Sequence, residues 1–353
     1  MARNEKKPPG LFLLEGISCL SFNKDFKFAA LSKRDHIIYI YSVSNIMSPD
    51  SWKLVTKLDS HTNYISGIDW NHQTNKILSC SYDKTSFVFE NTGNRWIPSS
   101  VVASTKLGFL CCKWNKKGTK FCEGTSAKNL FIGYFNTESN WWMCRNIKHH
   151  KSSVVSCEID GSSLLVISGS VDLRVFISSC YIPSVDGQQN APEFGEKLYE
   201  FRANCWVNSV TFCGGYGIAA GQNATIGVID CGNQKTNIIK CKHAPVLNVI
   251  PCSENSFLAV CFDRQIIEYE KKGDKFEPKR TITSGGAKAS GPASGVSGAL
   301  QKFSAMGNQK KENLAVVTKQ FAHLHKSLIS SITIKGKDII TTDLSGFVKY
   351  WKL

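Results

Sequence analysis

Residues 65–70 read Ile-Ser-Gly-Ile-Asp-Trp, Asp83 follows thirteen residues later, and residues 87–89 read Phe-Val-Phe. The same pattern recurs with other residues over positions 17–40 and 154–177, each time with an Asp thirteen residues after the first apolar segment. Such short alternating segments are typical of half-buried strands, and an Asp between two of them favours a tight turn. A period of about 45 residues built in this way predicts the blades of a WD40-type β-propeller.

Four further copies bring the number of repeats to seven. They begin with apolar segments at residues 110–114, 207–212, 246–249 and 329–334. A chain of 353 residues suits seven blades folded as one unit. We therefore predict an all-β fold, a single seven-bladed WD40 propeller over residues 1–353, in which residues 11–14 pair with the last blade and close the ring.

Four repeats place a His on the loop ahead of the turn Asp. The carboxylate of such an Asp can accept backbone N–H bonds in the turn and a further bond from the His. The predicted pairs are His61 with Asp83, His150 with Asp172, His243 with Asp263, and His325 with Asp343. We interpret them as structural rather than catalytic or metal-binding. Blades 1, 3 and 5 lack a full pair, so their turns must be stabilised in another way.

Neither the cysteines nor the known catalytic motifs indicate a chemical site. The fourteen Cys residues form no C-x-x-C pair, and many fall in predicted strands, where Cys behaves as a small apolar residue. A phosphate-binding glycine loop, a G-x-S-x-G segment and an H-E-x-x-H pair are all absent from the sequence. We therefore expect no metal, no cofactor and no enzymatic activity. The sequence also has no apolar run long enough to span a membrane and no signal peptide, so we expect free thiols in the cytoplasm.

One stretch departs from the repeat and holds much of the charge. The chain carries a net charge of +15, and residues 271–326 hold eleven Lys and Arg against three Asp and Glu. Gly, Ser and Ala make up thirteen of the nineteen residues from 281 to 299, which describes a flexible linker. We predict a flexible basic insert at residues 279–322, between blades 6 and 7. Residues 314–324 are interpreted as the outer strand of blade 7.

Within the insert, apolar residues recur at helical spacing near residues 296–307. Val296, Leu300, Phe303 and Met306 would form one stripe of a short amphipathic helix. A helix this short is not stable alone in water, so the stripe must dock on the propeller's own flank or on another molecule. A long flexible linker would be a poor way to fix the helix on its own domain, so we favour docking on a partner molecule.

The basic charge of the insert suggests an acidic partner. Lys302, Lys310 and Lys311 are the candidate contacts. A nucleic-acid partner is not expected, because the stretch has few aromatic residues on which bases could stack.

Three further segments carry a resemblance to a known family. Residues 140–148, which include the pair Trp141-Trp142, residues 169–182 and residues 69–89 resemble the WD-repeat subunit 1 of the actin-related protein 2/3 complex. That family also has a long insert with a short helix between blades 6 and 7. The chain is similar to it as a divergent member.

The resemblance implies a non-catalytic scaffold that supports nucleation of branched actin filaments through protein–protein binding. Its implied partners are the actin-related proteins, the other subunits of the complex and the actin filament, with the insert helix contacting an actin-fold neighbour. The acidic tails of nucleation-promoting factors suit the basic surface. The implied location is the cytoplasm and the actin cytoskeleton, and a nuclear pool is compatible with it. The alternative is a WD40 adaptor in another assembly, such as a vesicle coat, a chromatin complex or a ubiquitin ligase.

Overall fold

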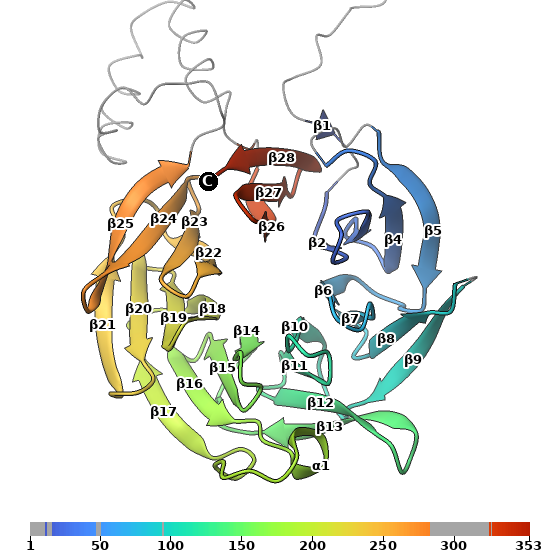
Figure 1. Cartoon of the computed structure of the whole chain (residues 1–353), viewed down its shortest axis with the longest axis horizontal. Coiled ribbons are helices and arrows are strands. Elements are labelled where there is room, and N and C mark those ends of the chain that lie inside the picture. Colours follow the sequence, from blue (N-terminus) through green and yellow to red (C-terminus); the bar gives the residue numbers. More distant parts are fainter. Residues whose placement is uncertain (1–10, 13–15, 47–50, 94, 283–324, 326) are drawn as a thin grey trace, which may run out of the picture.

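In the part of the chain that the structure describes, twenty-eight strands form a ring of blades around a central axis, and Figure 1 looks down that axis. The computed structural model describes residues 11–12, 16–46, 51–93, 95–282, 325 and 327–353. Each blade is antiparallel and holds four strands, which follow one another outward from the axis in chain order, except that the last blade borrows its fourth strand. The prediction of an all-β, seven-bladed WD40 propeller is confirmed.

The first four blades follow each other along the chain without interruption. Blade 1 holds β2 (Cys19–Phe22), β3 (Phe28–Ser32), β4 (Ile37–Ser42) and β5 (Lys53–Asp59). Blade 2 holds β6 (Ile65–Trp70), β7 (Ile77–Ser81), β8 (Ser86–Asn91) and β9 (Trp96–Val102). Blade 3 holds β10 (Phe109–Trp114), β11 (Lys120–Thr125), β12 (Leu130–Asn136) and β13 (Trp141–Ile147). Blade 4 holds β14 (Val154–Ile159), β15 (Leu165–Ser170), β16 (Arg174–Ser179) and β17 (Lys197–Arg202), with the short helix α1 (Pro183–Asp186) between its last two strands.

The remaining three blades complete the ring. Blade 5 holds β18 (Val207–Cys213), β19 (Tyr216–Gly221), β20 (Thr225–Asp230) and β21 (Lys235–Lys240). Blade 6 holds β22 (Val246–Ser253), β23 (Ser256–Cys261), β24 (Ile266–Lys272) and β25 (Lys275–Ile282). Blade 7 holds β26 (Ile329–Lys335), β27 (Asp338–Asp343) and β28 (Phe347–Lys352), together with β1 (Leu11–Phe12) from the start of the described chain.

The two ends of the chain close the ring in one sheet. Strand β1 runs antiparallel to β28, with Leu11 opposite Val348. This pairing places an N-terminal strand on the last blade, as predicted, and covers an edge that β28 would otherwise expose. The outer strand predicted for residues 314–324 lies outside the described residues, and β1 occupies the place beside β28.

The core lies between neighbouring blades and explains the pattern of the second strands. A second strand is covered on both faces by adjacent blades, so its side chains are buried without alternation. Every residue of β23, Ser-Phe-Leu-Ala-Val-Cys, is buried, and so is every residue of β7 and β11. The small and apolar residues of these strands therefore determine how closely the blades pack.

Blades 2 and 3 are joined at their outer strands. Residues of β13 pair in parallel with β9, Trp142 opposite Val101 and Met143 opposite Val102, so the two blades form one eight-stranded sheet. Trp142 is buried and packs edge-on against Trp114. Its neighbour Trp141 points outward and is 48% exposed. The double Trp thus combines a core residue with a surface residue.

Most of the predicted insert lies outside the described residues, which include only the end of β25 from the range 279–322. The predicted helix near 296–307 falls in the same gap. Among the described residues, no helix is long and apolar enough to cross a membrane.

Candidate interaction surfaces

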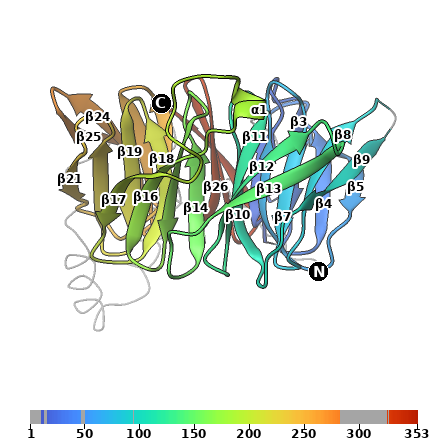
Figure 2. The ribbon, with the colours of Figure 1, turned by 90° about the horizontal axis from the view of Figure 1, so that it is seen from below.

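The loops of the propeller lie on two opposite faces. One face carries the loops that precede each inner strand and the turns between the second and third strands. We call it the histidine face, because His61, His150, His243 and His325 all lie there. The connection that carries α1 belongs to the other face, which is the upper one in Figure 2.

In three blades the predicted His and Asp meet at the base of a turn. The Nδ1 atom of His61 lies 3.1 Å from Oδ2 of Asp83, and its Nε2 atom lies 2.7 Å from Oγ of Ser79. The same arrangement recurs in blade 4 for His150, Asp172 and Ser168, and in blade 7 for His325, Asp343 and Thr341. In blade 7 the Trp351 indole N–H also donates to Thr341, at 2.6 Å.

The electrostatics of these pairs suit a structural role. Burial lowers the pKa of His61 and of His325, which favours the neutral imidazole. Burial alone would raise the pKa of Asp83, but hydrogen bonds from Thr85 and from backbone N–H groups outweigh it and hold that pKa below its usual range. Each such carboxylate therefore stays ionised and ties its turn to the preceding loop.

The pair in blade 6 is looser. His243 Nδ1 lies 3.3 Å from Asp263 Oδ2, and the two side chains are 30% and 32% exposed. Ala259 occupies the position that Ser79 takes in blade 2, so the hydroxyl that contacts the second ring nitrogen there is missing. The hydrogen bond to Asp263 raises the pKa of His243.

The turns of the other blades use different bonds. In blade 1 the Asp35 carboxylate accepts bonds from the backbone N–H of Ile37 and from the Tyr39 hydroxyl. In blade 5 the Asn223 side chain accepts bonds from Thr225 and from the Cys205 thiol. These contacts supply the alternative stabilisation that the sequence required in blades 1 and 5.

The difference between blades 6 and 7 leads to a matched prediction. His325→Ala should lower the free energy of unfolding by about 2 kcal/mol, because it removes the hydrogen bonds that join the imidazole to the buried side chains of Asp343 and Thr341. His243→Ala should cost less than about 1 kcal/mol, as expected for a partly exposed pair. Urea unfolding of both variants at pH 7 measures the two losses. Equal losses of free energy in the two variants would contradict the expectation that the buried pair stabilises the fold more than the partly exposed pair.

Large apolar side chains project from the histidine face. Tyr64, Tyr82 and Leu107 are 56%, 46% and 51% exposed. Their loops adjoin, since the backbone N–H of Tyr82 donates to the carbonyl of Tyr64 and Gly108, next to Leu107, lies against the backbone of Tyr82. Leu173, in a turn of blade 4, is 39% exposed, and Trp206, in the loop before blade 5, is 59% exposed. Exposed aromatic side chains of this kind are typical anchors of protein interfaces.

These aromatic residues were not among the predicted contacts, although their position in the repeat carries a signal. Tyr64 and Trp206 both come directly before the first residue of an inner strand. Gly16 and Gly108 hold the equivalent position in blades 1 and 3. Since glycine is accepted at this loop position, the fold does not need a large aromatic residue there. An aromatic residue at this position therefore indicates a contact with another molecule.

The histidine face is also basic. Its described loops and turns carry nine Lys and Arg: Lys33, Arg34, Lys84, Lys106, Lys128, Lys148, Lys151, Lys242 and Arg264. The Asp carboxylates of the same turns already accept hydrogen bonds or pair with His within the propeller, as described above. The charge that this face offers to a partner is therefore positive, and it surrounds exposed aromatic groups.

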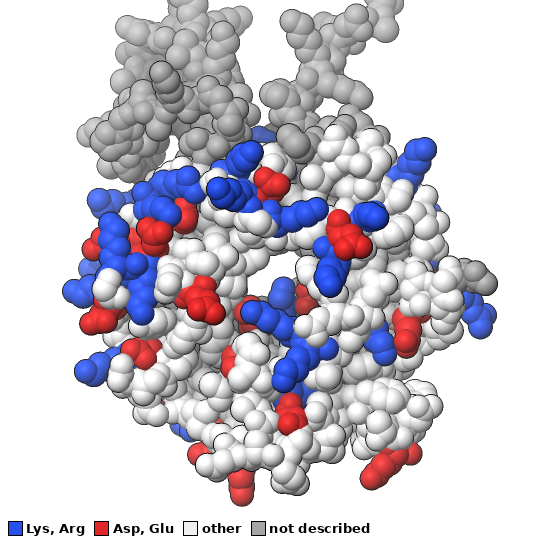
Figure 3. Space-filling view, viewed as in Figure 1, with Lys and Arg blue, Asp and Glu red and all other residues white. Residues whose placement is uncertain are grey.

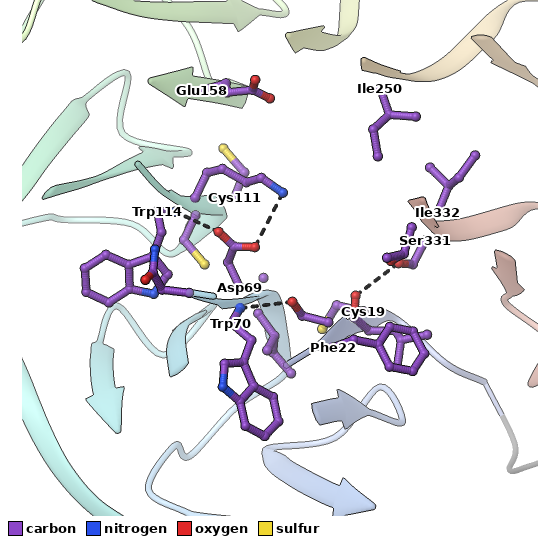
Figure 4. Close-up of a pocket in the computed structure, with 18 of the residues that line it drawn as sticks. Cys19, Phe22, Asp69, Trp70, Cys111, Trp114, Glu158, Ile250, Ser331 and Ile332 are labelled. Atoms are coloured by element: carbon purple, nitrogen blue, oxygen red, sulfur yellow. Dashed lines mark hydrogen bonds and ion pairs between the residues drawn. The ribbon is translucent and has the colours of Figure 1, made fainter. Parts of the chain in front are cut away.

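The central channel is a cavity with a volume of about 700 Å³. Figure 3 shows its opening, with Lys and Arg along part of the rim, and Figure 4 shows Asp69 and Glu158 projecting from its wall. Lys113 lies between them in the order of the blades, and its Nζ atom is 3.4 Å from Asp69 Oδ1. Asp69 raises the pKa of Lys113, and burial raises the pKa of Glu158. The positive charge of Lys113 offsets the negative charge of the carboxylates, so these side chains do not form a strongly negative patch on the channel wall.

The predicted contacts in the insert lie outside the described residues. These are Val296, Leu300, Phe303 and Met306 of the helix and Lys302, Lys310 and Lys311. The described residues also contain no group of three or more His, Cys, Asp or Glu side chains placed to hold a metal ion.

Comparison with known proteins relates the whole chain to one group of subunits. Residues 52–90 match the family model of the WD domain, G-beta repeat. The chain is 28% identical to actin-related protein 2/3 complex subunit 1A-A of Xenopus laevis, over 96% of this chain and 95% of the relative. It is 27% identical to subunit 1B of Arabidopsis thaliana, over 96% and 94% of the two chains. Subunit 1 of Schizosaccharomyces pombe is 23% identical over 70% of each chain.

Proposed function

We propose that this chain, a divergent relative of the subunit 1 proteins of the actin-related protein 2/3 complex, is a non-catalytic scaffold subunit of such a complex. The observation that carries the proposal is the similarity over nearly the full length of both chains, which includes all seven blades. A closed propeller offers a rigid surface on which partners can be held in fixed positions. The subunit would support nucleation of branched actin filaments by binding rather than by catalysis, in the cytoplasm and at the actin cytoskeleton.

The partners we propose follow from the two kinds of surface. The insert helix, with Leu300 and Phe303 on its apolar stripe, would contact an actin-fold neighbour, either an actin-related protein or the actin filament. The histidine face combines exposed Tyr64 and Trp206 with uncompensated Lys and Arg. Charge complementarity and aromatic anchors suit an acidic segment with apolar residues, such as the tail of a nucleation-promoting factor. Lys302, Lys310 and Lys311 would extend the basic surface.

Affinity purification of the chain from its native cell tests this function. The expected result is recovery of two actin-related proteins together with smaller subunits. Recovery of vesicle-coat, chromatin or ubiquitin-ligase components instead would overturn the proposal and favour the adaptor alternative.

Variants in the same experiment test the two surfaces separately. Phe303→Asp should leave the propeller folded and reduce recovery of actin-fold partners or filament branching, whereas Asn308→Asp, which adds the same charge, should not.

Tyr64→Ala with Trp206→Ala should weaken binding of an acidic tail at least tenfold, since interface aromatic residues contribute about 2 kcal/mol or more. Ile238→Ala, at an exposed apolar residue of β21, is the matched control. Unchanged assembly, branching and tail binding in these variants would mean that the surfaces are assigned wrongly.

A further inference from the structure

Two cysteines of blades 5 and 6 face each other at the histidine face. Cys241 is the first residue of the loop after β21, and it is partly exposed. Cys261 is the last residue of β23, and it is buried. Their sulfur atoms lie 4.0 Å apart. The pair thus joins a partly exposed residue to a buried one.

The loose pair of blade 6 belongs to the same cluster. His243 follows Cys241 by two residues, and its ring is 30% exposed beside Asp263. Since Ala259 replaces the hydroxyl found in blades 2, 4 and 7, this imidazole lacks the second contact that anchors the other three. Asp263 favours its charged form, and a charged imidazole near a sulfur favours the thiolate.

Several donors surround the Cys241 sulfur. The Cys261 thiol, the backbone N–H of His243 and the Tyr269 hydroxyl hydrogen-bond to it, and together they lower the pKa of the Cys241 thiol despite its burial. The pKa of Cys261 is raised, because its proton is the one shared between the two sulfurs. Burial raises the pKa of the partly exposed thiols of Cys231 and Cys252. Cys241 therefore differs from them in its donors and not simply in its exposure.

We propose that Cys241 is a reactive thiol that a peroxide oxidises and that then forms a disulfide with Cys261. In the first step the Cys241 thiolate attacks the hydroxyl oxygen of the peroxide, so that an S–O bond forms and the O–O bond breaks, and the other oxygen takes a proton from solvent and leaves as water or an alcohol. In the second step the Cys261 sulfur attacks the Cys241 sulfenic acid. An S–S bond forms, and the hydroxyl leaves as water with the proton from Cys261. Two electrons pass from the two thiols to the peroxide.

The geometry allows the second step with a local movement. The sulfurs must approach from 4.0 Å to a bond length of about 2.05 Å. Cys241 lies outside the β21 ladder, which ends at Lys240, so its side chain can move without breaking strand pairing.

Limited alkylation of the full chain with iodoacetamide at pH 7, followed by peptide mass mapping, tests the reactivity of the thiol. Cys241 should react about tenfold or more faster than Cys231 and Cys252, because its hydrogen-bond donors favour the thiolate whereas burial disfavours it at the other two cysteines. Equal rates at the three cysteines would overturn the proposal.

Treatment of the full chain with hydrogen peroxide tests the disulfide. Mapping without reduction should recover the peptides of Cys241 and Cys261 joined and lighter by two hydrogens. In Cys261→Ala the joined peptide should disappear and dimedone should trap a sulfenic acid on Cys241, whereas Cys231→Ser should behave like the unmodified chain. Peroxide oxidation that leaves Cys241 unchanged, or that joins it to a different cysteine, would contradict the pairing.

Discussion

Lys120→Met is expected to lower the free energy of unfolding by about 3–5 kcal/mol, the usual cost of removing one partner from a buried ion pair. The Lys120 side chain is fully buried, and its Nζ atom lies 2.7 Å from Oδ2 of Asp186. The same ammonium group donates to the backbone carbonyls of Ser163 and Cys180. Methionine has a similar length but no donor, so one carboxylate and two carbonyls would remain buried without this partner.

The position of Lys120 explains why the effect should be large. It starts β11 in blade 3, and Asp186 ends α1 in blade 4, so the ion pair fixes the connection between β16 and β17 against the neighbouring blade. Asp186 also accepts the backbone N–H of Ile182, at 2.8 Å. The single side chain therefore holds both the contact between blades and the conformation of this loop.

Urea unfolding with two companion variants measures this effect. Lys117→Met, at an exposed lysine three residues away, should change the free energy of unfolding by less than about 0.5 kcal/mol. Lys120→Met combined with Asp186→Asn should recover part of the loss, because a neutral amide still accepts from Ile182 and leaves no buried charge. If Lys120→Met costs no more than Lys117→Met, the buried ion pair does not stabilise the fold.

Glu123→Gln should stabilise the protein at alkaline pH, by about 3–5 kcal/mol at pH 9 relative to pH 5, at 1.36 kcal/mol per unit of pKa shift. Glu123 is fully buried in β11, where one carboxylate oxygen accepts from Ser86 and the other has no hydrogen-bond partner. Burial raises the pKa of Glu123 to about 8. Glutamine is neutral at every pH, so the variant removes the cost of ionising this group in the core.

The sign follows from proton binding. Between pH about 4.5 and about 8 the folded protein keeps the Glu123 proton while the unfolded chain loses it, so rising pH favours the unfolded chain. The contribution of Glu123 to stability is fully present below its pKa in the unfolded chain. It is lost as the pH rises through the pKa of Glu123 in the folded protein. The difference between the unmodified chain and Glu123→Gln in urea unfolding at pH 5 and pH 9 isolates this group from other titrations.

Glu138→Gln is the matched control, because Glu138 is exposed in the turn between β12 and β13. Its effect should be small and should not change between pH 5 and pH 9. A Glu123→Gln difference that is also constant with pH would mean that Glu123 is ionised in the folded protein.

Much of the fold could be predicted because its signals are local. The spacing from an inner strand to its turn lies within one repeat, so the sequence revealed both the number of blades and the His–Asp positions. The pairing of an N-terminal strand, residues 11–12, with the last blade also followed, because a circular array must pair its ends. The partner residues proposed for the insert remain predictions.

Other features depend on contacts between residues far apart in the chain. The parallel pairing of β9 with β13, the ion pair of Lys120 with Asp186, and the closeness of Cys241 to Cys261 join different blades or distant loops. No periodicity within a repeat encodes them. The exposed aromatic residues of the histidine face likewise form one surface only when the ring brings their loops together.

The sequence alone thus determined the propeller, because alternating strands and turn residues act over a few positions and repeat with a fixed period. Only the tertiary structure decided which Lys is buried, which Trp is exposed and which thiols meet. Those properties arise from packing between blades, where a side chain's surroundings come from residues tens of positions away.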